Sequence, residues 1–194
     1  MKAMRFAILA AAALIVAACL PVTTKNPVGT TMGFKSDPGL LGLWKGHGDD
    51  DTQDAYVAFL ANDDGTMTAL LISPDEKGSE WESYTIKTAA LGDNHLMNVW
   101  GVLKNGKAVE EQEASTDILL AYRFEKDGKL TLSLLDEKAT ADAIKAGKIQ
   151  GIVDPGNMGD VHITAEPAAL DAFFASKEAA TLFSEKLITF SKVE

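Results

Sequence analysis

The fold of this chain is decided by one stretch, Ile118-Leu119-Leu120-Ala121-Tyr122-Arg123-Phe124, then Glu125-Lys126-Asp127-Gly128, then Lys129-Leu130-Thr131-Leu132-Ser133-Leu134. In the last part leucines alternate with polar residues, which is the pattern of a half-buried β-strand. In the first part every second residue from Ile118 is large and apolar, so these side chains share one strand face. The residues between the two parts favour a turn. We expect a β-hairpin over 118–134.

Similar patterns on either side of this hairpin extend the β structure. A second hairpin is predicted from segments 55–60 and 66–72, which flank the turn residues Asn62-Asp63-Asp64-Gly65. A first strand is expected at Gly42-Leu43-Trp44, and Asn105-Gly106 is expected to turn one strand back into Ala108-Val109. Further strands are predicted over 82–88, 96–103, 161–164 and 187–193.

Helices are predicted in the later part of the chain. One spans Glu137 to Ala146, with Asp136 as its N-cap and Gly147 ending it. Another begins at Pro167 and carries an apolar stripe formed by Leu170, Phe173 and Phe174. Ser176 is expected to cap a short helix that continues through Phe183.

These elements predict a mainly β protein with a few helices, of the α+β class. About eight strands joined by short connections favour a small antiparallel β-barrel, because closure removes exposed strand edges. A strongly curved open sheet covered by the late helices is the alternative.

The N-terminal segment has the layout of an export signal. Lys2 and Arg5 precede an unbroken apolar run from Phe6 to Leu20. As a helix this run would reach about 22 Å, which is shorter than the roughly 30 Å hydrocarbon core of a bilayer. We therefore expect residues 1–18 to be a cleaved signal peptide.

The run ends in Val16-Ala17-Ala18-Cys19, which resembles the lipobox of bacterial lipoproteins. The resemblance implies cleavage before Cys19, a diacylglyceryl group on its sulfur and often a further acyl chain on the new N-terminus. Cys19 is the only cysteine in the chain, so it has no disulfide partner within it. Two or three acyl chains anchor a protein stably in a membrane. The alternative interpretation of this segment is an ordinary secretory signal without lipid attachment.

The position after the lipobox cysteine bears on location. In that family an Asp there favours the inner membrane of enteric-type bacteria, and here the residue is Leu20. We expect a lipid anchor in the outer membrane with the protein facing the periplasm; the inner membrane and the cell surface are alternatives. Residues 19–37 are expected to be the lipidated cysteine and a flexible tether, and residues 38–194 one β-rich globular domain.

Charge excludes some partners. Removal of residues 1–18 takes Lys2 and Arg5 from the 18 basic residues, which leaves 16 basic against 28 acidic residues and a net charge of −12. Such a surface repels nucleic acid and anionic headgroups. We expect membrane attachment through the acyl chains on Cys19, an envelope protein as partner, and no nucleic acid.

Two resemblances concern the domain itself. Gly42-Leu43-Trp44 is similar to the Gly-x-Trp that opens lipocalins, which implies a barrel that holds one small or lipidic ligand. In lipocalins an arginine late in the barrel packs over the tryptophan; Arg123 is the only arginine of the mature chain, but it does not match that position. The stretch from Leu40 to Lys45 resembles uncharacterised bacterial lipoproteins with Leu-x-Gly-x-Trp-Lys, a resemblance that implies no activity.

The candidate ligand-binding residues are aromatic. Trp44, Tyr84, Trp100 and Tyr122 lie on predicted strands and would line a cavity, while the alternative is that they fill an ordinary core. An apolar cavity predicts bound lipid, and a filled core predicts none.

Catalytic and metal motifs are not expected. The acidic stretch from His47 to Asp54 lacks the ligand order of a calcium loop. His47, His95 and His162 are far apart, and His162 is expected to face solvent. Gly78-Ser79 lacks the pattern of a nucleophile elbow. We expect neither an enzyme nor a cofactor, but a structural or protein-interaction lipoprotein, with a lipocalin-like binding protein as the alternative.

Overall fold

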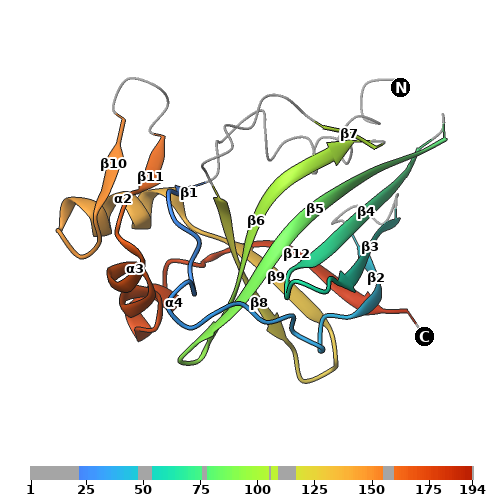
Figure 1. Cartoon of the computed structure of the whole chain (residues 1–194), viewed down its shortest axis with the longest axis horizontal. Coiled ribbons are helices and arrows are strands. Elements are labelled where there is room, and N and C mark those ends of the chain that lie inside the picture. The colour runs from blue at the N-terminus through green and yellow to red at the C-terminus, as the bar shows by residue number, and fades with distance from the viewer. Residues whose placement is uncertain are drawn as a thin grey trace.

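The chain forms an antiparallel barrel with a smaller layer of strands and helices on its flank (Figure 1). The computed structural model describes residues 22–47, 54–75, 78–104, 106–108, 117–154 and 160–193. The predictions for Cys19 and residues 1–18, and most of the acidic stretch after His47, lie outside these residues.

Eight strands close the barrel, each antiparallel to both of its neighbours. Because β12 pairs with β2 and β6 pairs with β8, the ring has no open edge. This confirms the predicted mainly β fold and small antiparallel barrel. In ring order the strands are β2 (Gly42–His47), β3 (Asp54–Ala61), β4 (Met67–Asp75), β5 (Gly78–Leu91), β6 (Asn94–Lys104), β8 (Asp117–Phe124), β9 (Leu130–Leu134) and β12 (Glu185–Lys192).

Both predicted hairpins are present. β8 and β9 pair from Leu120 with Leu134 to Phe124 with Leu130, and Gly128 has the positive φ of 81° that its turn requires. β3 and β4 form the second hairpin. The short β7 (Lys107–Ala108) turns back along the end of β6, as Asn105-Gly106 predicted.

The barrel interior is filled by large side chains from the alternating inward positions of the strands. Trp44 is 2% exposed, and Met67 and Leu130 are fully buried. The cluster that fills the interior comprises Leu40, Trp44, Val57, Phe59, Met67, Ala69, Ile86, Met97, Leu120, Tyr122, Leu130, Leu132 and Phe190. Hydrophobic burial on this scale is the main term that stabilises a small barrel.

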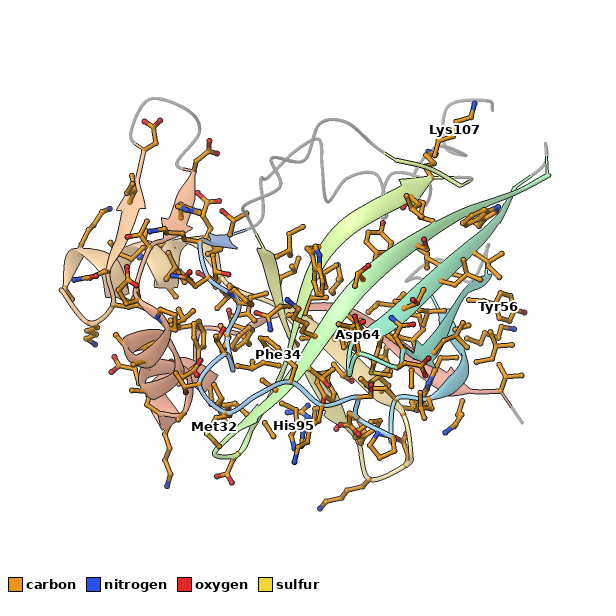
Figure 2. All side chains as sticks on the ribbon, in the orientation of Figure 1. Met32, Phe34, Tyr56, Asp64, His95 and Lys107 are labelled. Carbon is orange, nitrogen blue, oxygen red and sulfur yellow. The ribbon has the colours of Figure 1, made fainter. Side chains whose placement is uncertain are left out.

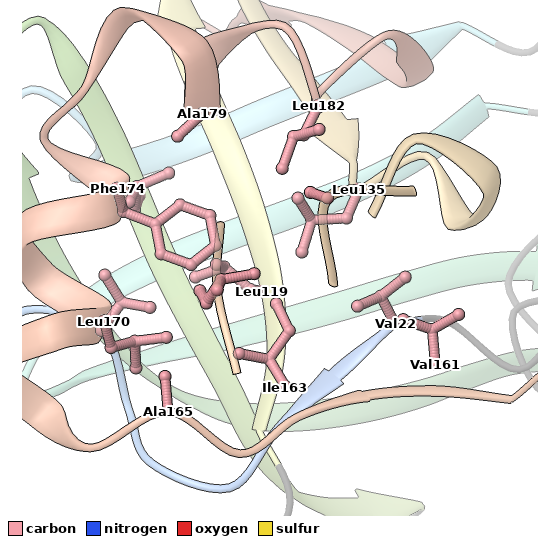
Figure 3. Close-up of a cluster of buried hydrophobic side chains, with 14 of the residues drawn as sticks. Val22, Leu119, Leu135, Val161, Ile163, Ala165, Leu170, Phe174, Ala179 and Leu182 are labelled. Atoms are coloured by element: carbon pink, nitrogen blue, oxygen red, sulfur yellow. The ribbon is translucent and has the colours of Figure 1, made fainter. Parts of the chain in front are cut away.

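A second core lies between the outside of the barrel and the flanking layer (Figure 3). Leu119 points outward from β8 into this core, where it meets Leu170 and Phe174 from the late helices. The layer adds three short strands next to β8, in the order β10 (Gly151–Val153), β11 (Val161–Ile163) and β1 (Thr23–Thr24). Its helices are α2 (Glu137–Lys145), α3 (Pro167–Phe174) and α4 (Lys177–Ala180).

The helix ends follow the predicted caps. The Asp136 side chain accepts a hydrogen bond from the Ala139 N–H at 2.7 Å, and the Ser176 hydroxyl accepts one from the Ala179 N–H at 3.2 Å. Gly147 has a φ of 71° just after α2. The helix behind Ser176 is shorter than predicted, since α4 ends at Ala180 rather than Phe183.

The predicted flexible tether is wrong for residues 22–37. Val22 and Val28 are 3% and 0% exposed, and β1 pairs with both β8 and β11. The Val28 N–H donates to Asn98 Oδ1 at 2.7 Å, and Asn98 Nδ2 donates to the Val28 carbonyl at 2.9 Å. This segment therefore belongs to the folded domain, because its polar backbone groups find partners that lie far away in the sequence.

No helix within the described ranges is long and apolar enough to cross a membrane.

Candidate functional site

The four candidate aromatic residues do not share one cavity. Strand alternation and core contacts place Trp44, Tyr84 and Tyr122 on the inner face of the barrel. Trp100 lies on the outer face, where its ring centroid is 4.2 Å from the Lys87 ammonium. The expectation that Trp100 lines the interior is corrected, because Asn98 and Trp100 share the strand face that lies against residues 28–34.

One end of the barrel is closed by the segment that precedes β2. The Trp44 indole Nε1 donates to the Leu40 carbonyl at 2.7 Å, and the Tyr122 hydroxyl donates to Asp37 Oδ2 at 2.7 Å. The ring of Phe124 lies 6.2 Å from that of Trp44 and 6.0 Å from that of Tyr122. Aromatic rings therefore close this end of the barrel, and both the Trp44 indole N–H and the Tyr122 hydroxyl have hydrogen-bond partners.

A cation also covers Trp44, but it is not Arg123. The Lys192 ammonium, from β12, lies 5.3 Å from the centroid of the Trp44 ring. Arg123 is exposed on the outside and pairs with Glu125 at 2.7 Å. The cation over Trp44 is thus a lysine from the last strand.

The inward-facing groups at the opposite end of the barrel include a polar cluster. The Tyr84 hydroxyl donates to Glu82 Oε2 at 2.5 Å, and the Lys104 ammonium lies 3.7 Å from Glu82 Oε1. Burial, followed by the hydrogen bond to Glu82, raises the pKa of Tyr84 well above its usual value of 10. Burial, followed by the hydrogen bond to Asp37, likewise raises the pKa of Tyr122 at the closed end. Both phenols are therefore neutral hydrogen-bond donors at neutral pH.

The apolar lining at this second end is less deeply buried than at the closed end. Ile118 and Leu134 lie near the ends of β8 and β9 on this side, Ile188 lies in the middle of β12, and all three are only half-buried. The partly buried residues that contact the barrel core here are Leu71, Tyr84, Val99, Ile118, Leu134, Leu187 and Ile188. The barrel is thus filled at one end and lined by half-buried apolar side chains at the other.

The histidines and acidic residues that the structure describes lie apart from one another or are held by local hydrogen bonds. Within the described ranges no three His, Cys, Asp or Glu side chains are placed to hold a metal ion, and no buried side-chain nitrogen or oxygen lacks a hydrogen-bond partner. The His95 ring, near the start of β6 (Figure 2), packs edge-on against Tyr122 with the ring centroids 5.4 Å apart, whereas His162 lies on β11 of the flanking layer. His162 is half-buried rather than solvent-facing as predicted, because its Nδ1 lies 2.8 Å from the Thr23 hydroxyl.

The outside of the barrel carries an apolar row that we call the outer wall. Successive partners across β2 to β6 are Leu43, Ala58, Leu70, Ser83 and Leu103. Leu43 is 38% exposed and Leu103 is 42% exposed. Leu60, at 53%, extends the same face from β3. The outer wall runs around half of the ring, so Leu43 on β2 and Leu103 on β6 lie on different sides of the barrel. The exposed leucines that neighbour each other on it are Leu43 on β2 and Leu60 on β3.

No protein-family model, curated protein or solved structure matches this chain. The function is therefore argued from the residues and their arrangement.

Several residues of these sites were not identified from the sequence. Asp37 and Lys192 lie in a turn and at the end of the last strand, and their partners Tyr122 and Trp44 are distant in the sequence. The outer wall did carry a signal, since Leu43, Leu60, Leu70 and Leu103 occupy the strand positions opposite the inward face.

Proposed function

We propose that this protein is a lipid-anchored lipoprotein of the bacterial cell envelope with a structural or protein-interaction role. The anchor is Cys19, the sequence that supports it is Val16-Ala17-Ala18-Cys19, and residues 1–18 are the signal peptide. The proposed location is the outer membrane, facing the periplasm, with the inner membrane and the cell surface as alternatives.

The observation that carries the interaction role is the contrast between the two faces of the barrel. Trp44 and Met67 fill the closed end of the interior, whereas Leu43 and Leu60 are exposed on the neighbouring strands β2 and β3 of the outer wall. A stable monomer gains nothing from exposing these two leucines side by side, so a partner protein that covers them is the favoured explanation.

Site-specific photocross-linking in cells tests this role. A cross-linking amino acid is placed at Leu43 or Leu60 on the outer wall, and at Lys138 of α2, whose side chain is 86% exposed, as control. We expect Leu43 and Leu60 to capture the same envelope protein and Lys138 not to capture it. Capture of nothing at the outer wall, or of the same proteins at all three positions, contradicts the interaction role.

A second candidate function rests on the half-buried end of the barrel. Ile118, Leu134 and Ile188 there offer apolar contacts, and the Tyr84–Glu82 pair offers polar ones, to a small or lipidic ligand. Native mass spectrometry of the chain from residue 20 onward distinguishes the two candidates. A stoichiometric adduct would favour the binding protein, whereas the bare polypeptide mass is expected if the interior is filled by side chains. Neither candidate includes a cofactor or a catalytic step.

A further inference from the structure

The distance along the chain between the anchor and the folded domain is short. Val22 is 3% exposed, and Thr23 and Thr24 are held between β8 and β11. Only Leu20 and Pro21 separate Val22 from Cys19. Three residues of extended chain span at most about 11 Å. Acyl chains on Cys19 therefore hold the domain directly at the headgroup layer, which is about 5–8 Å thick on each side of a bilayer.

The place where the chain leaves the domain is defined by strand register. β1 runs parallel to β11, with Thr23 opposite His162 and Thr24 opposite Ile163. Val22 is therefore level with Val161, the first residue of β11, and the two side chains lie next to each other in Figure 3. The link to Cys19 thus emerges beside the β10–β11 pair rather than beside the outer wall.

One large apolar side chain is exposed on that pair. Ile152, in the middle of β10, is 59% exposed. Its neighbours Gly151 and Val153 face the other way: a Cβ on Gly151 would lie 2.4 Å from Ile144 of α2, and Val153 packs against the flanking core. The cross-strand partner of Ile152 is His162, whose own partner is Thr23, so these residues share the face away from the helices.

β10 is also the outermost strand of the sheet, on the side opposite β7. Its outer edge has no neighbouring strand among the described residues, and the exposed Ile152 side chain stands on the same strand, so β10 offers both to a contact. The net negative charge of the mature chain disfavours electrostatic attraction to anionic lipid headgroups. A contact between the β10–β11 pair and the lipid surface would therefore be made by apolar side chains.

We propose that the β10–β11 pair rests on the lipid surface with Ile152 in the interfacial region of the bilayer. This orientation rests on the proposed function, because it requires the acyl chains on Cys19. In this orientation the short link to the lipid fixes how the domain faces the membrane. The outer wall, carried by β2 to β6 on the barrel, stays available to a partner protein (Figure 1).

Fluorescence of the full lipidated protein in vesicles of zwitterionic phosphatidylcholine tests the orientation. An environment-sensitive dye is attached to Ile152→Cys or, as a matched control, to Leu60→Cys, which is 53% exposed on the outer wall. Acylated Cys19 does not react with the dye, so the label is single. We expect a blue-shifted emission, quenched by spin-labelled lipid, at Ile152 and neither effect at Leu60.

A linker variant tests the cause of the orientation. Insertion of twelve Gly/Ser residues between Pro21 and Val22 lengthens the link by a chain of about 19 Å root-mean-square span. The quenching at Ile152→Cys should fall in this variant while the acyl groups on the N-terminal peptide, measured by mass spectrometry, stay unchanged.

The outcomes separate the two proposals. An acylated protein in which the dye at Ile152 is unquenched, or quenched to the same extent as the dye at Leu60, overturns the orientation and leaves the lipoprotein assignment intact. If the inserted linker does not reduce the quenching at Ile152, the short link between Cys19 and Val22 is not the cause of the orientation, and the proposal is overturned. An N-terminal peptide without acyl groups overturns the proposed function itself.

Discussion

The carboxylate of Asp171 accepts a hydrogen bond from the backbone N–H of Gly29 at 2.6 Å, across 142 positions of sequence. Asp171 is 5% exposed on α3, and its second oxygen accepts hydrogen bonds from the N–H of Thr31 at 2.9 Å and from the Thr31 hydroxyl at 2.5 Å. One buried carboxylate therefore fastens the segment around Gly29 and Thr31 to helix α3.

Removal of this carboxylate should loosen the N-terminal segment. Asp171→Ala leaves the buried N–H of Gly29 and the partly buried N–H of Thr31 without their acceptor, and we expect a loss of about 2–4 kcal/mol in the free energy of unfolding. Asp142→Ala, an exposed Asp on α2, is the matched control and should change stability little. Urea unfolding of the chain from residue 20 onward measures the stability of both variants. Equal unfolding midpoints for the two would contradict a stabilising role for the hydrogen bonds to Asp171.

The inward and outward positions of β2 should differ sharply in their contribution to stability. Trp44→Ala removes a side chain that is 2% exposed and should cost about 3–5 kcal/mol. Its neighbour Leu43 is on the outer wall, so Leu43→Ala should cost less than about 1 kcal/mol. Thermal or urea unfolding measures the difference; similar losses for both would contradict the assignment of the two faces.

Gly46 tests whether the barrel interior is filled. A Cβ at Gly46 would lie 2.8 Å from Ile188 Cδ1 and 2.8 Å from Phe190 Cε1. Gly46→Val should therefore destabilise the protein by about 1–3 kcal/mol through overpacking. The loss should shrink in the background of Phe190→Leu, which frees space. Equal losses in both backgrounds, measured by unfolding, would show that the two residues do not compete for volume.

Alkaline pH should destabilise the protein through its two buried phenols. The pKa of Tyr84 and the pKa of Tyr122 are raised above 10, so above about pH 10 the unfolded chain loses protons that the folded chain retains. Below about pH 10 the titration of these two phenols does not change the free energy of unfolding, and above it the free energy of unfolding falls as pH rises. Urea midpoints at rising pH should show a weaker decline in the Tyr84→Phe Tyr122→Phe double variant; an unchanged slope would contradict this origin.

The barrel strands were predictable because their signals are local. In 129–134 the leucines alternate with polar residues, and the turn with Gly128 lies beside them, so the hairpin needs no distant contact to be recognised. The same holds for the caps at Asp136 and Ser176, whose acceptors and donors lie three residues apart.

The remaining features depend on contacts that no local pattern contains. Segment 22–37 has the composition of a linker, yet Asn98 and Asp171 hold it through hydrogen bonds that span 70 to 142 positions. Trp100 was expected inside because β6 carries apolar residues on both faces. Leu96 lies in the flanking core and Met97 lies in the barrel core, so alternation could not decide which face points inward.

Lipid attachment at Cys19 is the central claim, and metabolic labelling with a clickable palmitate analogue tests it most directly. The wild-type protein is compared with Cys19→Ser, purified from the same cells. We expect label on the wild-type protein at Cys19 or its N-terminus and none on the serine variant, which should remain unprocessed or soluble. Label retained by the serine variant, or absent from the wild-type protein, would contradict the lipoprotein assignment.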